Sequence, residues 1–294
     1  MIWIVGNKGM LGSELSQILE NRGIECVGTD KDVDILDPMA LVAFAANKDI
    51  SLIVNCAAYT AVDKAENEES LALRLNAEGP ANLAALAVKR HAGFIHISTD
   101  YVFDGEGSVP YKENDPVAPL GAYGRTKAEG EKRIQAIDPD AIIIRTAWLY
   151  GQYGKNFVST MLGLMNGKSE LSVVADQYGS PTWAHDLAEA ICAIADRTAP
   201  TAGIYHFTGE GTTTWYEFAC EIQRLGLEFG VLTTPCKVKA ITTDLYPTKA
   251  KRPAYSVLAK DKIKEAFGIY PPEWRDSLRK YFESIYQVKT GGEG

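Results

Sequence analysis

The sequence lacks an excess of positive charge. Its 30 Lys and Arg residues are outnumbered by 38 Asp and Glu residues, which gives a formal net charge of −8 over 294 residues. A basic face that could neutralise a phosphate backbone is therefore not expected, and we predict no nucleic-acid partner. A small molecule is the partner that this composition favours.

Long apolar runs are missing as well. No stretch approaches the roughly 20 apolar residues that span a bilayer, and Met1 leads into an apolar segment rather than a charged leader. We therefore expect no membrane insertion and a cytoplasmic protein.

Cysteine is scarce and scattered. The chain has five cysteines, an odd number, with no CxxC pair among them. This pattern excludes a disulfide framework and a zinc site as predictions, and free buried thiols are expected instead.

A glycine-rich turn is the first positive feature. Residues 2–5 are an apolar run, GNKGMLG follows with Gly6, Gly9 and Gly12, and apolar residues then recur at helical spacing from Leu11. Such a strand, turn and helix lets the backbone approach a pyrophosphate at the helix N-terminus. We predict a dinucleotide-binding turn here.

An acidic residue strengthens this prediction. A second strand, 25–29, ends at Asp30, about twenty residues beyond the turn, where a carboxylate accepts hydrogen bonds from the adenosine ribose. Asp30 favours NAD over NADP, but Lys8 and Lys31 could pair with a 2′-phosphate. The expected cofactor is therefore NADH or NADPH.

The rest of the chain alternates between strands and helices as far as residue 147. We expect strands at 52–55, 94–97, 142–144 and 204–207, two helices in 62–89 interrupted at Gly79-Pro80, and helices at 38–47, from 122, and at 157–166, 186–195, 215–225 and 272–286. The predicted fold class is α/β, a Rossmann-type doubly wound parallel sheet with a smaller C-terminal α/β substrate-binding lobe.

The predicted domain boundaries follow from the loss of this alternation. Residues 1–147 form the NAD(P)-binding domain, to which 184–198 return, and residues 148–183 and 199–290 form the substrate-binding lobe. Residues 291–294 are expected to be a flexible tail.

Small residues follow the third strand, at the sheet edge where α/β proteins bind ligands. Ala57 and Ala58 can let the cofactor's ribose and pyrophosphate pass, although tight packing explains them too. After the second strand, Asp34 is placed to bond the adenine amino group, and Ile35 to cover the ring.

The stretch Ser98–Lys127 carries the predicted chemistry. Tyr123 and Lys127 are four residues apart on one helix, so their side chains share a face. An ammonium about 4 Å from a phenol contributes roughly 4 kcal/mol, or some three pKa units. We therefore expect the Tyr123 pKa to fall from about 10 towards neutrality.

A phenol of that kind is a general acid for a ketone that is being reduced. Thr99, at the end of the fourth strand, would bond the same substrate oxygen, and the cofactor would supply the hydride. Lys127 could also hold the nicotinamide ribose. The predicted catalytic residues are Thr99, Tyr123 and Lys127.

Together, GNKGMLG, Asp30, STDYVFDG and YGRTK resemble the extended short-chain dehydrogenase/reductases. Within that superfamily, NCAAYTAVDKAE, RTAWLYG, DQYGSPT, GTTTWYEFA and KRPAYS resemble the dTDP-4-dehydrorhamnose reductases. The resemblance implies reduction of the C4 ketone of dTDP-4-dehydro-L-rhamnose to dTDP-L-rhamnose, with Tyr123 as the proton donor.

The resemblance also implies binding residues. For the cofactor they are Gly9, Met10, Leu11, Asp30, Asp34, Ile35, Ala58, Tyr59, Thr60, Tyr123 and Lys127. For the sugar nucleotide they are Val62, Thr99, Asp100, Tyr101, Trp148 and Arg252, where the Arg252 guanidinium suits a diphosphate. Packing in the core is an alternative explanation for Trp148, and an ordinary surface position is an alternative explanation for Arg252.

Some relatives form a dimer around a magnesium ion held by glutamates. Glu14 matches one of these positions, but His185 stands where another glutamate is expected, which argues against the metal. A monomer or a homodimer remains open.

Four alternative functions differ from this expectation in what they require of the sequence. A sugar-nucleotide dehydratase needs an Asp-Glu pair after the threonine, whereas Asp100 is followed here by Tyr101, and an epimerase lacks this Thr-Asp-Tyr. A reductase of another 4-keto-6-deoxy sugar nucleotide stays open. A non-enzymatic NAD(P)-binding regulatory subunit is disfavoured because Thr99, Tyr123 and Lys127 are all present.

Overall fold

The structure, a computed structural model, describes residues 1–197 and 201–286. At its centre lies a six-stranded parallel sheet in the order β2-β1-β3-β4-β5-β10. Its strands are β1 (Ile2–Val5), β2 (Cys26–Thr29), β3 (Leu52–Asn55), β4 (Gly93–Thr99), β5 (Ile142–Thr146) and β10 (Gly203–His206). The strand order reverses between β1 and β3, so a ligand crevice is expected at their carboxyl ends.

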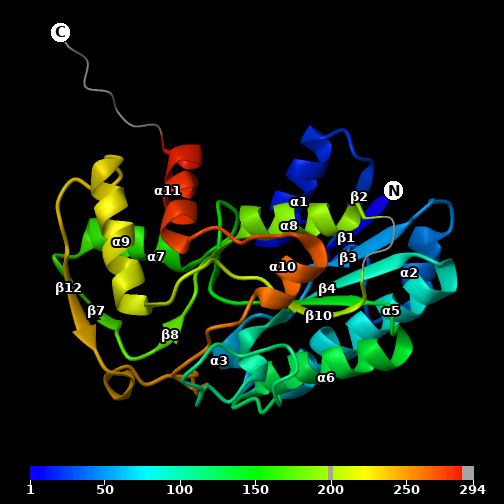
Figure 1. Cartoon of the computed structure of the whole chain (residues 1–294), viewed down its shortest axis with the longest axis horizontal. Coiled ribbons are helices and arrows are strands. Elements are labelled where there is room, and N and C mark those ends of the chain that lie inside the picture. The colour runs from blue at the N-terminus through cyan, green and yellow to red at the C-terminus, as the bar shows by residue number, and fades with distance from the viewer. Residues whose placement is uncertain (198–200, 287–294) are drawn as a thin grey trace, which may run out of the picture.

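Helices cover both faces of this sheet (Figure 1). One face carries α1 (Met10–Asn21), α8 (Ala184–Ala195) and α10 (Asp261–Phe267), and the other carries α2 (Pro38–Ala45), α5 (Gly79–Arg90) and α6 (Ala122–Ile137). Along β1, Ile4 packs into the first layer and Trp3 and Val5 into the second, because successive strand residues face opposite sides. The predicted doubly wound α/β fold is confirmed.

The segment after β3 differs from its prediction. Helices α3 (Val62–Ala65) and α4 (Glu69–Leu73) lead into the π-helical turn η1 (Arg74–Glu78), and α5 begins directly at Gly79. The expected interruption at Gly79-Pro80 was wrong, because Pro80 lies in the first turn of α5, where its missing N–H costs nothing.

A second layer of helices and short strands forms the lobe. Its helices are α7 (Phe157–Gly167), α9 (Trp215–Glu228) and α11 (Trp274–Ile285), and its parallel strand pair is β7 (Glu170–Val174) and β12 (Lys237–Ile241). Two-residue strands complete the lobe: β6 (Leu149–Tyr150), β8 (Tyr178–Gly179), β9 (Thr182–Trp183) and β11 (Thr213–Thr214). The chain also has two 3-10 turns, η2 (Asp100–Val102), which follows β4 of the main sheet, and η3 (Thr243–Leu245), which follows β12. Thr214 caps α9 through a capping box with Glu217, as its position predicts.

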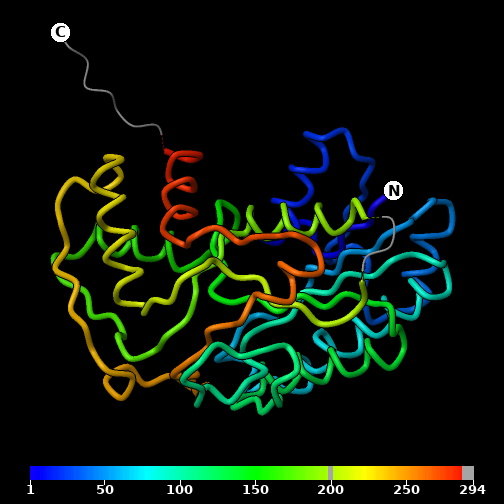
Figure 2. The backbone as a smooth tube through the Cα atoms, in the orientation of Figure 1, coloured from blue at the N-terminus to red at the C-terminus, as the bar shows by residue number. Residues whose placement is uncertain are grey.

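The strand expected at 204–207 was assigned to the lobe, and this was wrong. It is β10, which pairs with β5 in the main sheet, and Ile263 and Phe267 of α10 pack in the same core as Ile142. Figure 2 shows the chain leaving the lobe, reaching the sheet and returning to α11. The remaining domain division stays a prediction, and the expected tail 291–294 lies outside the described residues.

Within residues 1–197 and 201–286, no helix has the length and apolar character that crossing a membrane requires. The predicted strands and helices are otherwise present near their expected bounds. β7, β12 and α10 were missed, and β12 alternates lysines with small or apolar residues at an exposed position, so its apolar signal is weak.

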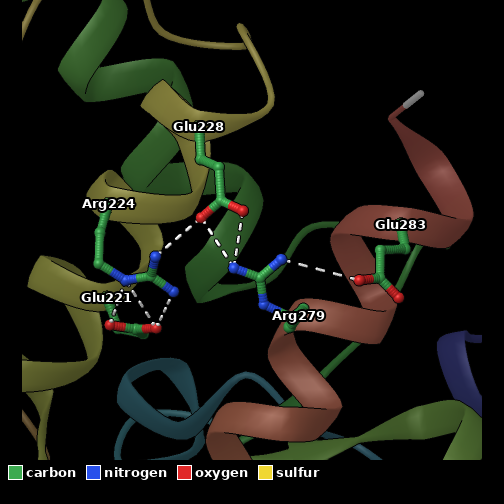
Figure 3. A network of polar contacts seen from close by, with 5 residues as sticks. All are labelled: Glu221, Arg224, Glu228, Arg279 and Glu283. Carbon is green, nitrogen blue, oxygen red and sulfur yellow. Dashed lines mark hydrogen bonds and ion pairs between the residues drawn. The ribbon is translucent and has the colours of Figure 1, made fainter. Parts of the chain in front are cut away.

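Charged side chains join α9 to α11 on the surface of the lobe (Figure 3). Arg279 bonds Glu228 at 2.7 Å, and Arg224 bonds both Glu228 and Glu221. In the core of the lobe, the fully buried Trp274 of α11 packs edge-on against Phe218 of α9 with ring centroids 5.7 Å apart. Apolar packing should therefore hold the two helices more than the ion pairs do.

We predict that Trp274→Ala lowers the free energy of unfolding by about 3–5 kcal/mol because it empties a buried site. Arg279→Ala should lower it by at most about 1 kcal/mol, since exposed ion pairs contribute little. Urea denaturation followed by circular dichroism measures both. Equal losses for the two variants would contradict this assignment.

Candidate active site

The glycine turn after β1 packs so closely against neighbouring backbone that Gly6 and Gly12 have no room for a side chain. Gly6 has φ +81°, and a Cβ there would lie 2.8 Å from the Ala57 nitrogen. A Cβ on Gly12 would lie 2.2 Å from the Gly6 carbonyl oxygen. Gly9 caps α1 without a side chain, so the first-turn N–H groups of Met10 and Leu11 have no side-chain cap. This open helix N-terminus fits a pyrophosphate.

Asp30 follows β2, next to this turn, where the Gly6 and Asn7 amides both donate to the Thr29 carbonyl. Its position suits a ribose hydroxyl. Asp34 is exposed and accepts a hydrogen bond from the Leu36 amide at 2.9 Å. Ile35 is only 7% exposed and touches Gly79, so its side chain serves mainly the core.

Asn76 of η1 forms hydrogen bonds to the backbone of the segment that follows β3. The fully buried Asn76 side chain accepts from the Tyr59 amide at 2.8 Å and donates to the Tyr59 carbonyl at 3.1 Å. It also donates to the Thr126 hydroxyl on α6. Ala57, Ala58 and Thr60 of the predicted cofactor set therefore belong to a segment that is anchored at its middle.

Thr99 and Tyr123 come together at the carboxyl end of β4. The Thr99 hydroxyl interacts with the Tyr123 phenol and bonds the Asp100 carboxylate at 3.0 Å. The Tyr123 ring meets the edge of Tyr101, with centroids 5.5 Å apart. The prediction that Thr99 and Tyr123 can share one substrate oxygen is consistent with this geometry but stays a prediction.

The expected lowering of the Tyr123 pKa was wrong. Burial raises this pKa well above its usual range, and the hydrogen bond with Thr99 offsets only part of that. The Lys127 nitrogen does not bond the phenol; it donates to the Ile97 carbonyl at 2.6 Å and lies 3.1 Å from Nε2 of His96. Helical spacing placed both side chains on one face, but β4 supplies closer partners for the amine.

A buried ion pair lies one turn further along α6. Arg145 of β5 holds Glu131 through two bonds of 2.7 and 2.9 Å, and the Ser98 hydroxyl donates to the same carboxylate. Burial and the Arg145 charge lower the pKa of the neighbouring His206 to about 3. This network positions α6 against β4 and β5.

Three of the predicted sugar-binding residues, Asp100, Tyr101 and Arg252, lie near one another beside Tyr123. Asp100 is buried, its pKa is raised by burial to about 6, and its Oδ2 has no partner among the described residues. Arg252 bonds Asp63 at 2.7 Å and reaches the Tyr101 hydroxyl at 3.4 Å. The Arg252 guanidinium thus links Asp63 to the Tyr101 hydroxyl, and Tyr101 in turn packs against Tyr123.

Trp148 is held in an unusual backbone conformation. Its φ is +50°, which is rare for a large side chain. Its ring stacks on Trp215 of α9 at 3.5 Å and 9° and also lies against Gly179, where a Cβ would be 2.4 Å away. Backbone strain of this kind persists where surrounding packing enforces it, often at ligand sites.

An open hollow of about 460 Å³ borders Arg252. The residues 246–252 and 254 line most of it, together with Asp176 and Thr243. Lys249, Lys251 and Arg252 make this wall basic. Val62, at the start of α3, is partly buried beside Asp63, whose carboxylate joins Arg252 and the Ala250 amide.

The candidate magnesium ligand Glu14 is buried and paired differently. Its carboxylate lies 3.6 Å from Nδ1 of His185, and this contact raises the His185 pKa. Among the residues that the structure describes, no group of three or more His, Cys, Asp or Glu side chains is placed to hold a metal ion.

Several residues at this site carried no role in the sequence prediction. They are Asn55, Asp63, His96, Glu131, Arg145 and Trp215. One signal was present, because His96 and Arg145 are polar residues inside otherwise apolar strands, and such residues need buried partners. Their partners come from distant segments, which the sequence does not identify.

A glycine turn at the switch point of a parallel sheet, with a tyrosine and a lysine one helical turn apart beside it, defines a dinucleotide-binding protein of Rossmann type. The chain belongs to the family described as "RmlD substrate binding domain", whose model matches residues 1–287. This confirms the resemblance to the dTDP-4-dehydrorhamnose reductases.

Three relatives illustrate the similarity. A dTDP-4-dehydrorhamnose reductase of Aggregatibacter actinomycetemcomitans is 43% identical over 94% of this chain and 96% of its own. A probable dTDP-4,6-dihydroxy-2-methyloxan-3-one 4-ketoreductase of Streptomyces antibioticus is 43% identical over 97% and 96%. The crystal structure of dTDP-4-dehydrorhamnose reductase from Bacillus anthracis str. Ames in complex with NADP is 34% identical, with a TM-score of 0.91 over 97% of this chain and 99% of that one.

We predict that Asp30→Ala shifts cofactor preference towards NADPH, because the carboxylate that would bond the ribose hydroxyl and repel a 2′-phosphate is removed. The ratio of NADH to NADPH dissociation constants, from fluorescence titration, measures this. Asp49→Ala, an exposed acid at the amino edge of β3, is the charge-matched control and should leave the ratio unchanged. An unchanged ratio in Asp30→Ala would remove Asp30 from ribose recognition.

Proposed function

We propose that this protein reduces the C4 ketone of dTDP-4-dehydro-L-rhamnose to dTDP-L-rhamnose with NADH or NADPH. The observation that carries the proposal is that Thr99, Tyr123 and the Asp100 carboxylate, whose Oδ1 accepts from Thr99, lie together at the carboxyl end of β4. Beside them lies the open N-terminus of α1. Two relatives that are 34% and 43% identical carry the name of this activity.

The residues present fit a nicotinamide dinucleotide. The turn from Gly6 to Gly12 would hold its pyrophosphate, Asp30 its adenosine ribose, and the segment 57–60 its central part. When bound, the cofactor supplies a hydride to the substrate carbon. Asp34 and Ile35 are proposed to lie near the adenine, with little of Ile35 exposed for that contact.

Tyr123 is the proposed general acid. Its raised pKa keeps the phenol protonated at neutral pH, which is the form that can donate a proton to the carbonyl oxygen as it gains negative charge. Thr99 orients that oxygen through its hydroxyl. Lys127 lies one turn away and is proposed to hold the cofactor ribose.

The substrate's polar groups have matching partners. The free Oδ2 of Asp100 suits a sugar hydroxyl, and Trp148, stacked on Trp215, offers an apolar wall to the deoxy sugar. Arg252 suits the diphosphate, and the basic hollow beside it has room for phosphate groups. Val62 and Tyr101 are proposed to complete this site.

A second candidate is reduction of a different 4-keto-6-deoxy sugar nucleotide. The Streptomyces antibioticus relative, named for a different keto sugar, is as similar as the Aggregatibacter one, at 43% identity each. Overall identity therefore does not separate the two substrates. Elimination of water is disfavoured because Tyr101, bonded to Arg252, stands where a carboxylate base would be needed.

We also propose that the protein acts in the cytoplasm, where its proposed sugar-nucleotide substrate and nicotinamide cofactor occur. For its oligomeric state we propose a monomer or a homodimer.

We predict that the protein oxidises NADH or NADPH when dTDP-4-keto-6-deoxyglucose is supplied together with the 3,5-epimerase. NMR spectroscopy of the product should identify dTDP-L-rhamnose. A product that keeps the unepimerised sugar would support the second candidate. Tight cofactor binding without any turnover would support a regulatory subunit and overturn the proposal.

We predict that Tyr123→Phe lowers kcat at least about a hundredfold, because the proton donor is lost while the ring and its contact with Tyr101 remain. Cofactor affinity, measured by fluorescence titration, should change little. The exposed Tyr270 supplies the control, and Tyr270→Phe should keep full activity. A Tyr123→Phe variant that retains most of its activity would exclude Tyr123 as the acid.

A further inference from the structure

Three acidic side chains follow the predicted cofactor segment 57–60 at intervals of three residues. They are Asp63 on α3, Glu66 directly after α3, and Glu69 at the start of α4. Each acid bonds a different part of the protein, and two of these parts carry residues of the proposed active site. The short helices α3 and α4 therefore link segments that are distant in sequence.

Asp63 holds the segment 246–254, which we call the strap and most of which lines the hollow beside Arg252. Its Oδ1 accepts from the Ala250 amide at 3.1 Å, and its Oδ2 accepts from the Arg252 guanidinium at 2.7 Å. One carboxylate thus fixes both the strap backbone and the direction of the guanidinium. A guanidinium has more N–H donors than its bonds to Asp63 and Tyr101 use, so donors remain for a phosphate oxygen.

Glu66 caps the helix that carries Tyr123. Helix α6 begins at Ala122 after Gly121, a residue with no side chain that could accept from the first-turn amides. Oε1 of Glu66 accepts from the Ala122 amide at 2.8 Å instead. A Cβ on Gly121 would lie 2.6 Å from that oxygen, so the glycine permits the approach. The helix dipole also favours a carboxylate at this end.

A small apolar core brings the bonded segments together. Three alanines, one each from α3, α4 and α6, are fully buried in it: Ala65, Ala72 and Ala122. The Tyr123 ring packs against these alanines. The strap reaches the same place, because a Cβ on Gly121 would lie 4.0 Å from the Ala250 Cβ. The strap, α3 and the start of α6 therefore meet at one point, and two carboxylates bond across it.

Glu69 differs from the other two acids because its bonds lie on the surface. It binds Arg125 of α6 through two bonds of 2.9 Å, and both side chains are nearly half exposed. Exposed ion pairs contribute little to the position of the elements that they join. Glu69 shares the segment and the partner helix with Glu66 and is therefore a matched control.

We propose that Asp63 and Glu66 are positioning residues with separate tasks. Asp63 directs Arg252 towards the diphosphate of the substrate, and Glu66 fixes the start of α6 so that Tyr123 reaches the ketone oxygen. Both tasks rest on the proposed function, which assigns the diphosphate and the proton donor. They control different constants, because Asp63 acts on substrate binding and Glu66 on the chemical step.

Asp63→Asn separates the guanidinium from its anchor. The Asn carbonyl can still accept from Ala250, but its NH₂ group cannot accept from Arg252. We expect the dissociation constant of dTDP, from isothermal titration calorimetry, and the KM of the sugar nucleotide to rise at least about fivefold, because the arginine loses its ordering. The loss of a negative charge acts in the opposite direction, but that charge is nearly half exposed and screened by salt. The value of kcat should stay within about twofold.

Thymidine, which has no phosphate, is the ligand control for Asp63→Asn, and its affinity should not change. Unchanged or tighter dTDP binding would overturn the role of Asp63. An equal loss of thymidine and dTDP affinity would overturn it as well, because the effect would not act through the phosphates.

Glu66→Ala removes the acceptor of the Ala122 amide. We expect kcat to fall at least about tenfold, because a small displacement of a proton donor is costly, while dTDP affinity is kept. Glu66→Gln retains an oxygen that can accept and should keep most of the wild-type kcat. Amide hydrogen exchange at Ala122, followed by NMR, should be faster in Glu66→Ala than in the wild type or in Glu66→Gln. An unchanged kcat in Glu66→Ala, or an equal loss in both variants, would contradict the capping role.

Glu69→Gln should change neither kcat nor KM by more than about twofold. A purely structural role for α3 and α4 would change kcat and KM together in Asp63→Asn and Glu66→Ala, which would overturn this inference and leave the proposed function intact. A wild-type protein that binds dTDP but reduces neither keto sugar would count against the proposed function instead. The dTDP affinities and the exchange rates at Ala122 need no turnover and would still decide what Asp63 and Glu66 hold in place.

Discussion

The buried bond between Glu131 of α6 and Arg145 of β5 is the interaction on which the site's geometry depends. Both side chains are almost fully buried, and Ser98 shares the same carboxylate. Removing one partner of a buried pair leaves an uncompensated charge, which costs about 3–5 kcal/mol. Helix α6 therefore has one favourable position against the sheet, and Tyr123 is carried on it.

A close backbone contact and a side-chain hydrogen bond extend this constraint. A Cβ on Gly124 would lie 2.1 Å from the Tyr101 carbonyl oxygen, so α6 meets η2 directly. On its other side, α6 is tied through Thr126 to Asn76 in a π-helical turn, and π turns are frequent at functional sites. The ends of β3 and β4 are thus positioned by one helix, which aligns the proposed cofactor and substrate sites.

The proposed sugar-binding residues are fixed by few contacts. Trp148 is fixed by Trp215 and Gly179, and Arg252 is already bonded to Asp63 and Tyr101. Both anchors come from segments far from Tyr123 in the chain. If Trp148 and Arg252 hold the sugar nucleotide as proposed, changes around them would alter the sugar without altering the fold. Two relatives of equal identity to this chain carry the names of different keto sugars.

The sequence by itself determined the alternating strands and helices, the glycine turn and the residue types at the strand ends. These depend on hydrophobic periodicity and on steric limits that are local in the chain. Local sequence patterns did not predict two features, the π turn before Gly79 and the pairing of β10 with the main sheet. Strand pairing joins residues that are distant in sequence, and no local signal states the partner.

Tertiary structure alone decided which partner each polar side chain takes. Spacing placed Lys127 on the face of Tyr123, but His96 and the Ile97 carbonyl are closer partners, and burial rather than an ammonium controls the phenol. A buried polar group bonds whatever the packed neighbours present, and those neighbours come from three separate segments of the chain. The sequence thus specified the proposed reacting groups, and only the packing of β3, β4 and α6 decided which side chains they contact.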